Sequence, residues 1–290
     1  MKRTVAYVLG TVGRWIAISA VLSAILFLAA GTMRLSSLRA YLAMFSLVLL
    51  VTMLTVDPQL AHERAYPGPD SNTSHLHFAS GFLFLLTLLC ASFLVGRTHT
   101  LIVPTALRWI ALAIFMSSTS LQNWAMIANP FFSPVVRIQA ERRHSLIDSG
   151  PYRFIRHPGY FAMCISVPAS AVAIGSWLAL IPAFAFLLII RQRSNLEDHF
   201  LRMNLAGYAE YAKRVPSGSP FRKEYLICPT FREFHREVQL GTSRSLNLCS
   251  TLTKLRLCSR FIRRLCSAWP VWAKSMAFTS ASSGGSAPQT

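Results

Sequence analysis

The chain has 290 residues, of which 53% are hydrophobic and 14% charged, whereas soluble globular proteins average about 25% charged residues. Its 29 Lys and Arg residues against 11 Asp and Glu residues give a net charge of +18. This composition excludes a disordered, collagen-like or disulfide-stapled protein and argues against an ordinary cytosolic enzyme. A basic chain this apolar is better suited to anionic lipid than to nucleic acid, and it predicts a membrane protein.

Uncharged intervals predict where the chain crosses the bilayer, because about 20 apolar residues span a hydrocarbon core of about 30 Å. Four such intervals occur in the first half of the chain: 15–33, 40–56, 78–96 and 109–136. The fourth is longer than one crossing needs, and a helix end near Asn129 would absorb the excess. Lys and Arg residues before the first interval and after the fourth place both of those ends in the cytosol.

The longest uncharged stretch covers residues 157–190 and exceeds one crossing. Internal prolines and a Gly-Ser pair interrupt it, so we expect a helical hairpin that turns near Gly175. One long helix is the alternative. The choice matters because a hairpin returns the polar residues 191–198 to the side of residues 153–157, whereas a single helix separates them by the whole bilayer.

Two polar clusters flank this stretch. The first includes GPYRFIRHPGY at residues 150–160, and the second spans residues 191–198, in which Arg193 and Glu197 share one helix face. Their simplest interpretation is a positive-inside anchor and an interfacial ion pair. The combination of turn-bounded aromatic residues, an Arg-His-Pro sequence and a carboxylate pair on the same side instead favours a binding site, since polar groups beside a membrane are costly.

An ordered set of motifs resembles the isoprenylcysteine carboxyl methyltransferases and the wider group of phospholipid methyltransferase-like membrane enzymes. The set comprises the 150–160 run, the apolar hairpin, Glu197-Asp198, YAEY at 208–211 and RVP at 214–216. It covers about residues 129–221. In addition, Val-Asp-Pro at 56–58 through Glu-Arg at 63–64 is similar to bacterial members.

The resemblance implies S-adenosylmethionine (SAM) as the cofactor and Arg193 as the catalytic residue that lies against the prenylcysteine carboxylate. It assigns cofactor contacts to His144, Ser145, Leu146, Ile147, Tyr152, His157, Pro158, Gly159, Tyr160 and Glu197. Three features depart from the family pattern. Arg137 stands where eukaryotic members carry a glutamine that touches the cofactor, and Asn195-Leu196 replace part of a longer acidic run. The Gly207-Tyr208 spacing is also shorter than in the family.

The residue types suit these roles on chemical grounds. Tyr152 and Tyr160 offer aromatic faces to an adenine or a sulfonium, and Glu197 suits an ammonium or hydroxyl groups. An arginine fork such as Arg193 can hold a carboxylate in line with the methyl group. An amine acceptor would first have to lose a proton, and no separate general base is evident, which favours carboxyl methylation.

The predicted fold is all-α, a multi-pass transmembrane bundle of about five or six membrane-embedded helices with a cofactor pocket on the cytosolic side. Residues 1–136 form the N-terminal transmembrane helices and residues 137–221 the methyltransferase-like core with its hairpin. Residues 222–290 form a basic, poorly ordered tail.

The predicted function is SAM-dependent O-methylation of the carboxylate of a prenylated cysteine or a similar lipophilic acid. The setting is a bacterial inner membrane or the endoplasmic reticulum, among membrane lipids, with no metal and no nucleic-acid partner. Three alternatives stay open: a phospholipid N-methyltransferase, a membrane sterol-type reductase using NADPH, and a non-catalytic scaffold. The reductases usually carry a cysteine after the acidic pair, which is absent from residues 193–198.

Overall fold

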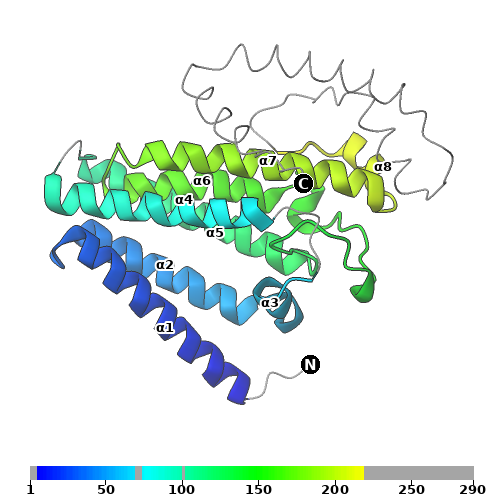
Figure 1. The fold of residues 1–290 in the computed structure, drawn as a ribbon, viewed down its shortest axis with the longest axis horizontal. Helices are drawn as coiled ribbons and strands as arrows, with labels where there is room; N and C mark the ends of the chain where they lie inside the picture. The colour runs from blue at the N-terminus through cyan, green and yellow to red at the C-terminus, as the bar shows by residue number, and fades with distance from the viewer. Residues whose placement is uncertain (1–4, 69–73, 100–101, 219–290) are drawn as a thin grey trace, which may run out of the picture. The chain divides into compact units, whose positions relative to one another are not determined.

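The computed structural model describes residues 5–68, 74–99 and 102–218 (Figure 1). Within these ranges the structure contains helices and loops and no β-strand, apart from one isolated bridge between Ile102 and Ser176. The long helices are α1 (Val5–Ala30), α2 (Ser36–Thr55), α4 (Ser74–Phe93, extended by η1, Leu94–Thr98), α5 (Thr105–Ala128), α6 (Pro158–Ile174) and α7 (Leu180–Asn204). The short ones are α3 (Pro58–Ala65), η2 (Ala140–Arg142), η3 (Gly150–Arg153) and α8 (Tyr208–Arg214). The predicted all-α fold class is confirmed.

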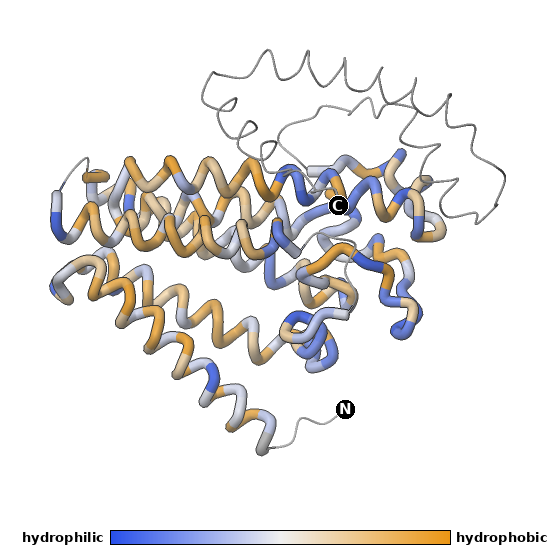
Figure 2. The backbone as a smooth tube through the Cα atoms, viewed as in Figure 1, coloured by the Kyte–Doolittle hydropathy of each residue, from blue (hydrophilic) through white to orange (hydrophobic). Residues whose placement is uncertain are grey.

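Four of the helices are long and apolar enough to cross a membrane: Tyr7–Ala30, Ser36–Thr55, Ser74–Thr98 and Thr105–Ala128. At 1.5 Å per residue each covers a hydrocarbon core of about 30 Å. Each coincides with one predicted interval, and α5 ends at Ala128, beside the Asn129 expected to end it. Figure 2 shows hydrophobic residues along the long helices and hydrophilic ones around α3 and the loop after α5.

Residues 157–190 form the predicted hairpin. Helix α6 ends at Gly175, whose φ of +124° favours glycine, and α7 begins at Leu180. The two helices pack through Val167 on α6 and through Ala183, Phe186 and Ile190 on α7. The alternative of a single span is therefore wrong, and the polar half of α7 returns to the side of the bundle where α6 starts.

Small residues on α6 let α5 pack closely along it. Ala169, Ser170 and Ala173 are all buried, which is typical of membrane interfaces, where small side chains allow backbones to approach.

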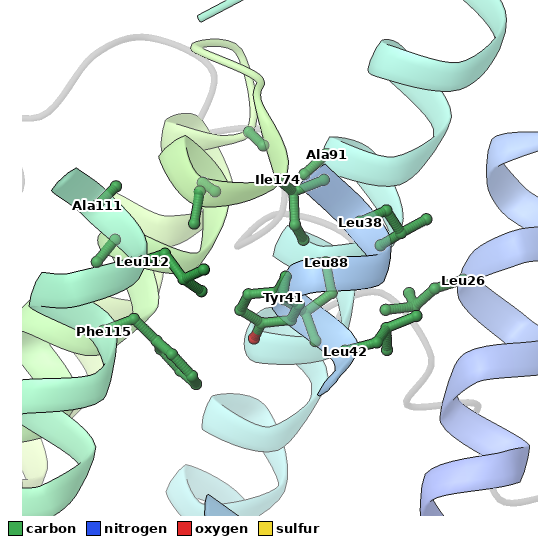
Figure 3. Packing of buried hydrophobic residues seen from close by; sticks show 14 of the residues in the cluster. Leu26, Leu38, Tyr41, Leu42, Leu88, Ala91, Ala111, Leu112, Phe115 and Ile174 are labelled. Carbon is green, nitrogen blue, oxygen red and sulfur yellow. The ribbon is translucent and has the colours of Figure 1, made fainter. Parts of the chain in front are cut away.

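The main apolar core lies beside the hairpin turn. Tyr41 on α2 lies among Leu88 of α4, Phe115 of α5 and Ile174 of α6 (Figure 3). Its hydroxyl donates to Ser170 Oγ at 3.1 Å, which satisfies a polar group that would otherwise be buried unpaired. This packing holds α2, α4, α5 and α6 together beside the turn.

The described residues, 5–68, 74–99 and 102–218, all belong to one compact unit. Within it α5, which precedes the predicted boundary at residue 136, packs directly on α6, which follows it. The predicted basic tail, residues 222–290, lies outside the described residues.

Candidate active site

A cavity of about 650 Å³ opens at the end of the bundle away from the hairpin turn. Its wall has two parts. The apolar section is lined by Phe45, Leu49, Phe84, Phe115 and Phe186. The polar end is lined by Arg64, His77, His157, Tyr160, Arg193 and Glu197.

The structure brings the predicted site residues together. Lining the cavity are Arg193 and nine of the ten predicted cofactor residues: His144, Ser145, Leu146, Ile147, Tyr152, His157, Gly159, Tyr160 and Glu197. They come from the loop between η2 and η3, from η3 itself, from the first turn of α6 and from α7. The exception is Pro158, which is buried at the first position of α6 and does not line the cavity. Its fixed φ suits the start of a helix, so its place is explained by the backbone.

Tyr160, Glu197 and Arg193 form a connected chain across the polar end. The Tyr160 hydroxyl donates to Glu197 Oε2 at 2.5 Å, and Arg193 Nε donates to the same hydroxyl at 2.9 Å. Arg193 also donates to the carbonyl of Pro134 and lies 3.3 Å from His77 Nδ1. Its side chain is 5% exposed. A buried arginine with this many fixed partners is held in one orientation, as a carboxylate clamp requires.

His157 pairs with Asp198 rather than with Glu197. Its Nε2 lies 3.3 Å from Asp198 Oδ1, which also accepts from Arg156 Nε at 2.8 Å and from the Tyr208 hydroxyl at 2.9 Å. Burial opposes ionisation of this carboxyl, but the His157 contact and the charge of Arg156 outweigh it, so the pKa of Asp198 lies well below its usual range. Asp198 thereby joins the start of α6 to α7 and α8.

The loop that carries residues 144–147 is fixed by local contacts. The His144 ring stacks on Phe131, with 4.3 Å between centroids, and its Nδ1 lies 3.4 Å from the backbone N of Gln139. Gln139 is fully buried, and its side chain donates to the Phe131 carbonyl and accepts from Arg142. Burial lowers the pKa of His144, so its ring is neutral at pH 7.

Arg137 does not line the cavity. Its guanidinium pairs with both oxygens of Glu63, at 3.0 and 2.7 Å, and with Glu141 at 2.5 Å. The hydrogen bonds that Arg137 donates to Glu63 raise the pKa of Arg137. The departure from the family glutamine at this position therefore has a structural use, which is to fasten α3 to the loop after α5.

Gly159 is required by a close approach. A Cβ at this position would lie 2.5 Å from the Phe132 ring, which packs against Val56, Leu60 and Met126. Gly159→Ala is expected to destabilise the protein by about 1–3 kcal/mol, because the ring must leave its packed position. Thermal unfolding in detergent measures this. Gly13→Ala is the control, since nothing lies within 4 Å of its added Cβ, and equal stability losses in both variants would contradict the steric explanation.

Comparison with known proteins identifies this region. Residues 109–203 match the model of the isoprenylcysteine carboxyl methyltransferase (ICMT) family. This segment is similar to the ICMT family over about a third of the chain. It contains α6, most of α7 and every predicted site residue.

Individual relatives agree with the family match over part of their length. Protein-S-isoprenylcysteine O-methyltransferase B of Arabidopsis thaliana is 32% identical over 122 residues, which are 39% of this chain and 60% of that protein. Protein-S-isoprenylcysteine O-methyltransferase of Schizosaccharomyces pombe is 27% identical over 133 residues, 44% of this chain and 54% of that protein. The chain thus spans about 60% or less of these relatives.

A solved structure is also similar. The eukaryotic intramembrane Ras methyltransferase ICMT aligns over 73% of this chain and 76% of its own, with 15% identity and a TM-score of 0.46.

Several contacts within and around residues 109–203 could not be predicted from the sequence. Asn129, which the sequence suggested only as the end of a helix, donates to the Tyr152 hydroxyl at 3.2 Å and so helps to position a predicted cofactor residue. Asp198 appeared only as the second member of an acidic pair. Arg64 appeared only as part of the Glu-Arg pair at 63–64, in a stretch similar to bacterial members of the family. Each of these residues contacts a partner that is distant in the sequence, so no local pattern indicates the contact.

The polar end has the groups to hold a zwitterionic cofactor. Glu197 uses Oε2 for Tyr160, and its Oε1 has no hydrogen-bond partner among the described residues, so it can accept from an ammonium or a hydroxyl. The Tyr160 ring offers an aromatic face next to it. The carboxylate of Glu197 and the ring of Tyr160 therefore fit SAM, the cofactor that methyltransferases of this kind generally use.

Proposed function

We propose that this protein is a SAM-dependent membrane methyltransferase that forms an ester on the carboxylate of a prenylated cysteine or a similar lipophilic acid. The observation that carries the proposal is the position of Arg193. It is buried and lines the same cavity as Tyr160 and Glu197, whose wall also includes the apolar section. One cavity can therefore accept a charged donor and a lipid-borne acid together.

Some side chains of the cavity would bind the cofactor, and Arg193 would align the acceptor. Glu197, Tyr160, His157 and the loop 144–147 would hold SAM, which supplies the methyl group. Arg193 would hold the acceptor carboxylate by two parallel hydrogen bonds and fix the direction of one oxygen. Because a carboxylate is already ionised at neutral pH, no side chain has to remove a proton from it.

The apolar section would receive the lipid part of the acceptor. Its aromatic and aliphatic walls belong to α2, α4, α5 and α7. The first three of these helices are apolar enough to cross a bilayer. A lipid chain could enter from the membrane while SAM enters from water. We infer that the polar end faces the cytosol, because Lys and Arg residues gather on that side.

A binding titration tests the cofactor. The purified full chain in detergent is expected to bind SAM with a Kd in the micromolar range and to show no saturable binding of NADPH. Glu197→Ala and His157→Ala are expected to abolish SAM binding, since each removes a polar contact from the same end of the cavity. Saturable NADPH binding would support a reductase instead, and binding of neither would support a scaffold.

The acceptor is tested by radiolabelled methyl transfer to N-acetyl-S-farnesylcysteine. The labelled product should be a methyl ester, which base hydrolyses. Transfer to ethanolamine phospholipids alone would contradict carboxyl methylation and support the phospholipid N-methyltransferase alternative.

A further inference from the structure

Three cationic or ionisable basic side chains from three different helices meet at the polar end. Arg64 comes from α3, His77 from α4 and Arg193 from α7, and all three line the cavity. Arg193 contacts His77 directly at 3.3 Å. Arg64 donates to the Phe132 carbonyl and Arg193 to the Pro134 carbonyl, so the two guanidinium groups lie against the same short segment of chain.

Within the described part of the chain, neither arginine has an acidic partner in direct contact. Among residues 5–68, 74–99 and 102–218, no carboxylate forms an ion pair with Arg64 or Arg193. Arg64 donates only to the Phe132 carbonyl at 3.4 Å and lies over that residue's ring. By contrast, the buried Arg137 and Arg156 are each paired with a carboxylate.

Arg193 is buried and Arg64 half-buried, and the nearest carboxylate to Arg193, that of Glu197, is reached only through the Tyr160 hydroxyl. Cations removed from water without a direct carboxylate contact are costly. An anionic group bound between them would remove that cost. The cluster therefore has the charge of a binding site for an anion, and its position beside the apolar section points to an anion carried by a lipid.

Helix α3 holds Arg64 in place. Asp57 caps its first turn by accepting from the backbone N of Gln59 at 2.7 Å, and Glu63 near its end is fastened to Arg137. Since Glu63 and Arg64 are consecutive, they leave the helix about 100° apart. The Glu63 pair thus fixes the direction in which Arg64 enters the cavity.

We propose that Arg64 is a second positioning residue for the acceptor and that Arg64, His77 and Arg193 together select a carboxylate over an amine. This rests on the proposed function of the site. A carboxylate can bind both guanidinium groups, whereas the ammonium of an ethanolamine lipid would be repelled by them. Charge alone would then distinguish carboxylate acceptors from amine acceptors, and no general base is needed for the carboxylate.

The test compares N-acetyl-S-farnesylcysteine with its carboxamide, which differs only in charge at the reacting end. Binding of each to the full chain in detergent is measured for the native protein and for the Arg64→Gln and Arg64→Lys variants. The native protein should prefer the acid, and Arg64→Gln should reduce that preference about tenfold or more with little change in carboxamide affinity or SAM affinity. Arg64→Lys should restore part of the preference, since it keeps the charge but not the fork.

Arg153→Gln is the matched control. Arg153 is an exposed arginine at the end of η3, and it does not line the cavity. It should leave the acid preference unchanged. An unaltered preference in Arg64→Gln, or equal losses for acid, carboxamide and SAM, would overturn the proposal. So would a native protein that does not prefer the acid. If the preference depends on Arg64 but no methyl ester forms with SAM, the anion site stands and the proposed reaction fails.

Discussion

Arg193→Ala is expected to lower kcat/KM for N-acetyl-S-farnesylcysteine by about 10²-fold or more while leaving SAM affinity nearly unchanged. The reason is alignment: loss of the guanidinium fork frees the acceptor carboxylate, and small misplacements of reacting groups cost on the order of 10²-fold in rate. Arg193→Lys should recover little, because an ammonium cannot make the two parallel hydrogen bonds. Ester formation at varied acceptor concentration and SAM binding by titration are the two measurements.

Gln192→Ala is a suitable control for this experiment, since Gln192 is the preceding residue on α7 and is exposed. It should retain native kinetics. Arg193 also donates to the Tyr160 hydroxyl, so a loss of SAM binding as large as the loss of activity would show that Arg193 serves the donor side and would contradict its role as the acceptor clamp.

Asp198→Ala is expected to destabilise the protein by about 3–5 kcal/mol, the usual cost of breaking a buried ion pair by removing one partner. Arg156 would remain buried without its carboxylate, and His157 and Tyr208 would each lose an acceptor. SAM affinity should fall as well, because His157 begins the helix that carries Tyr160. Thermal and denaturant unfolding in detergent provide the measurement.

The same carboxyl predicts an acid-labile fold. Because the folded-state pKa of Asp198 is lowered, its stabilisation is complete above its unfolded pKa of about 3.9 and is lost as the pH falls below that value. The loss of stability below pH 4 should therefore be smaller in Asp198→Asn than in the native protein. Glu210→Gln, which removes an exposed pair with Lys213, should change neither stability nor its pH dependence, and a comparable effect there would contradict the assignment.

The membrane topology follows from local features of the sequence. Hydrocarbon thickness sets the length of the four uncharged intervals, and each became a helix of 20 residues or more. Prolines and Gly175 within an overlong apolar stretch predicted the hairpin, and the hairpin alone requires that His157 and residues 193–198 lie on one side. The residues of the polar end were therefore predictable as a set.

The partners within that set were not predictable. The adjacent acids on α7 have different partners. Glu197 accepts a hydrogen bond from Tyr160, whereas Asp198 pairs with His157 and Arg156. Helical periodicity says which face a side chain occupies, but consecutive residues differ by about 100° and their partners depend on the packing of a second helix.

By itself, the sequence determined an all-α membrane bundle, its hairpin and the residues that gather at one end, because hydrophobic length and turn chemistry act over short stretches of chain. Only the tertiary structure decided that Glu63 is paired with Arg137 and that Arg64 shares a cavity with Arg193 with no carboxylate partner among the described residues. These contacts join residues about 70 or more positions apart, and their geometry is set by how α3, α4 and α7 pack, which no local pattern encodes.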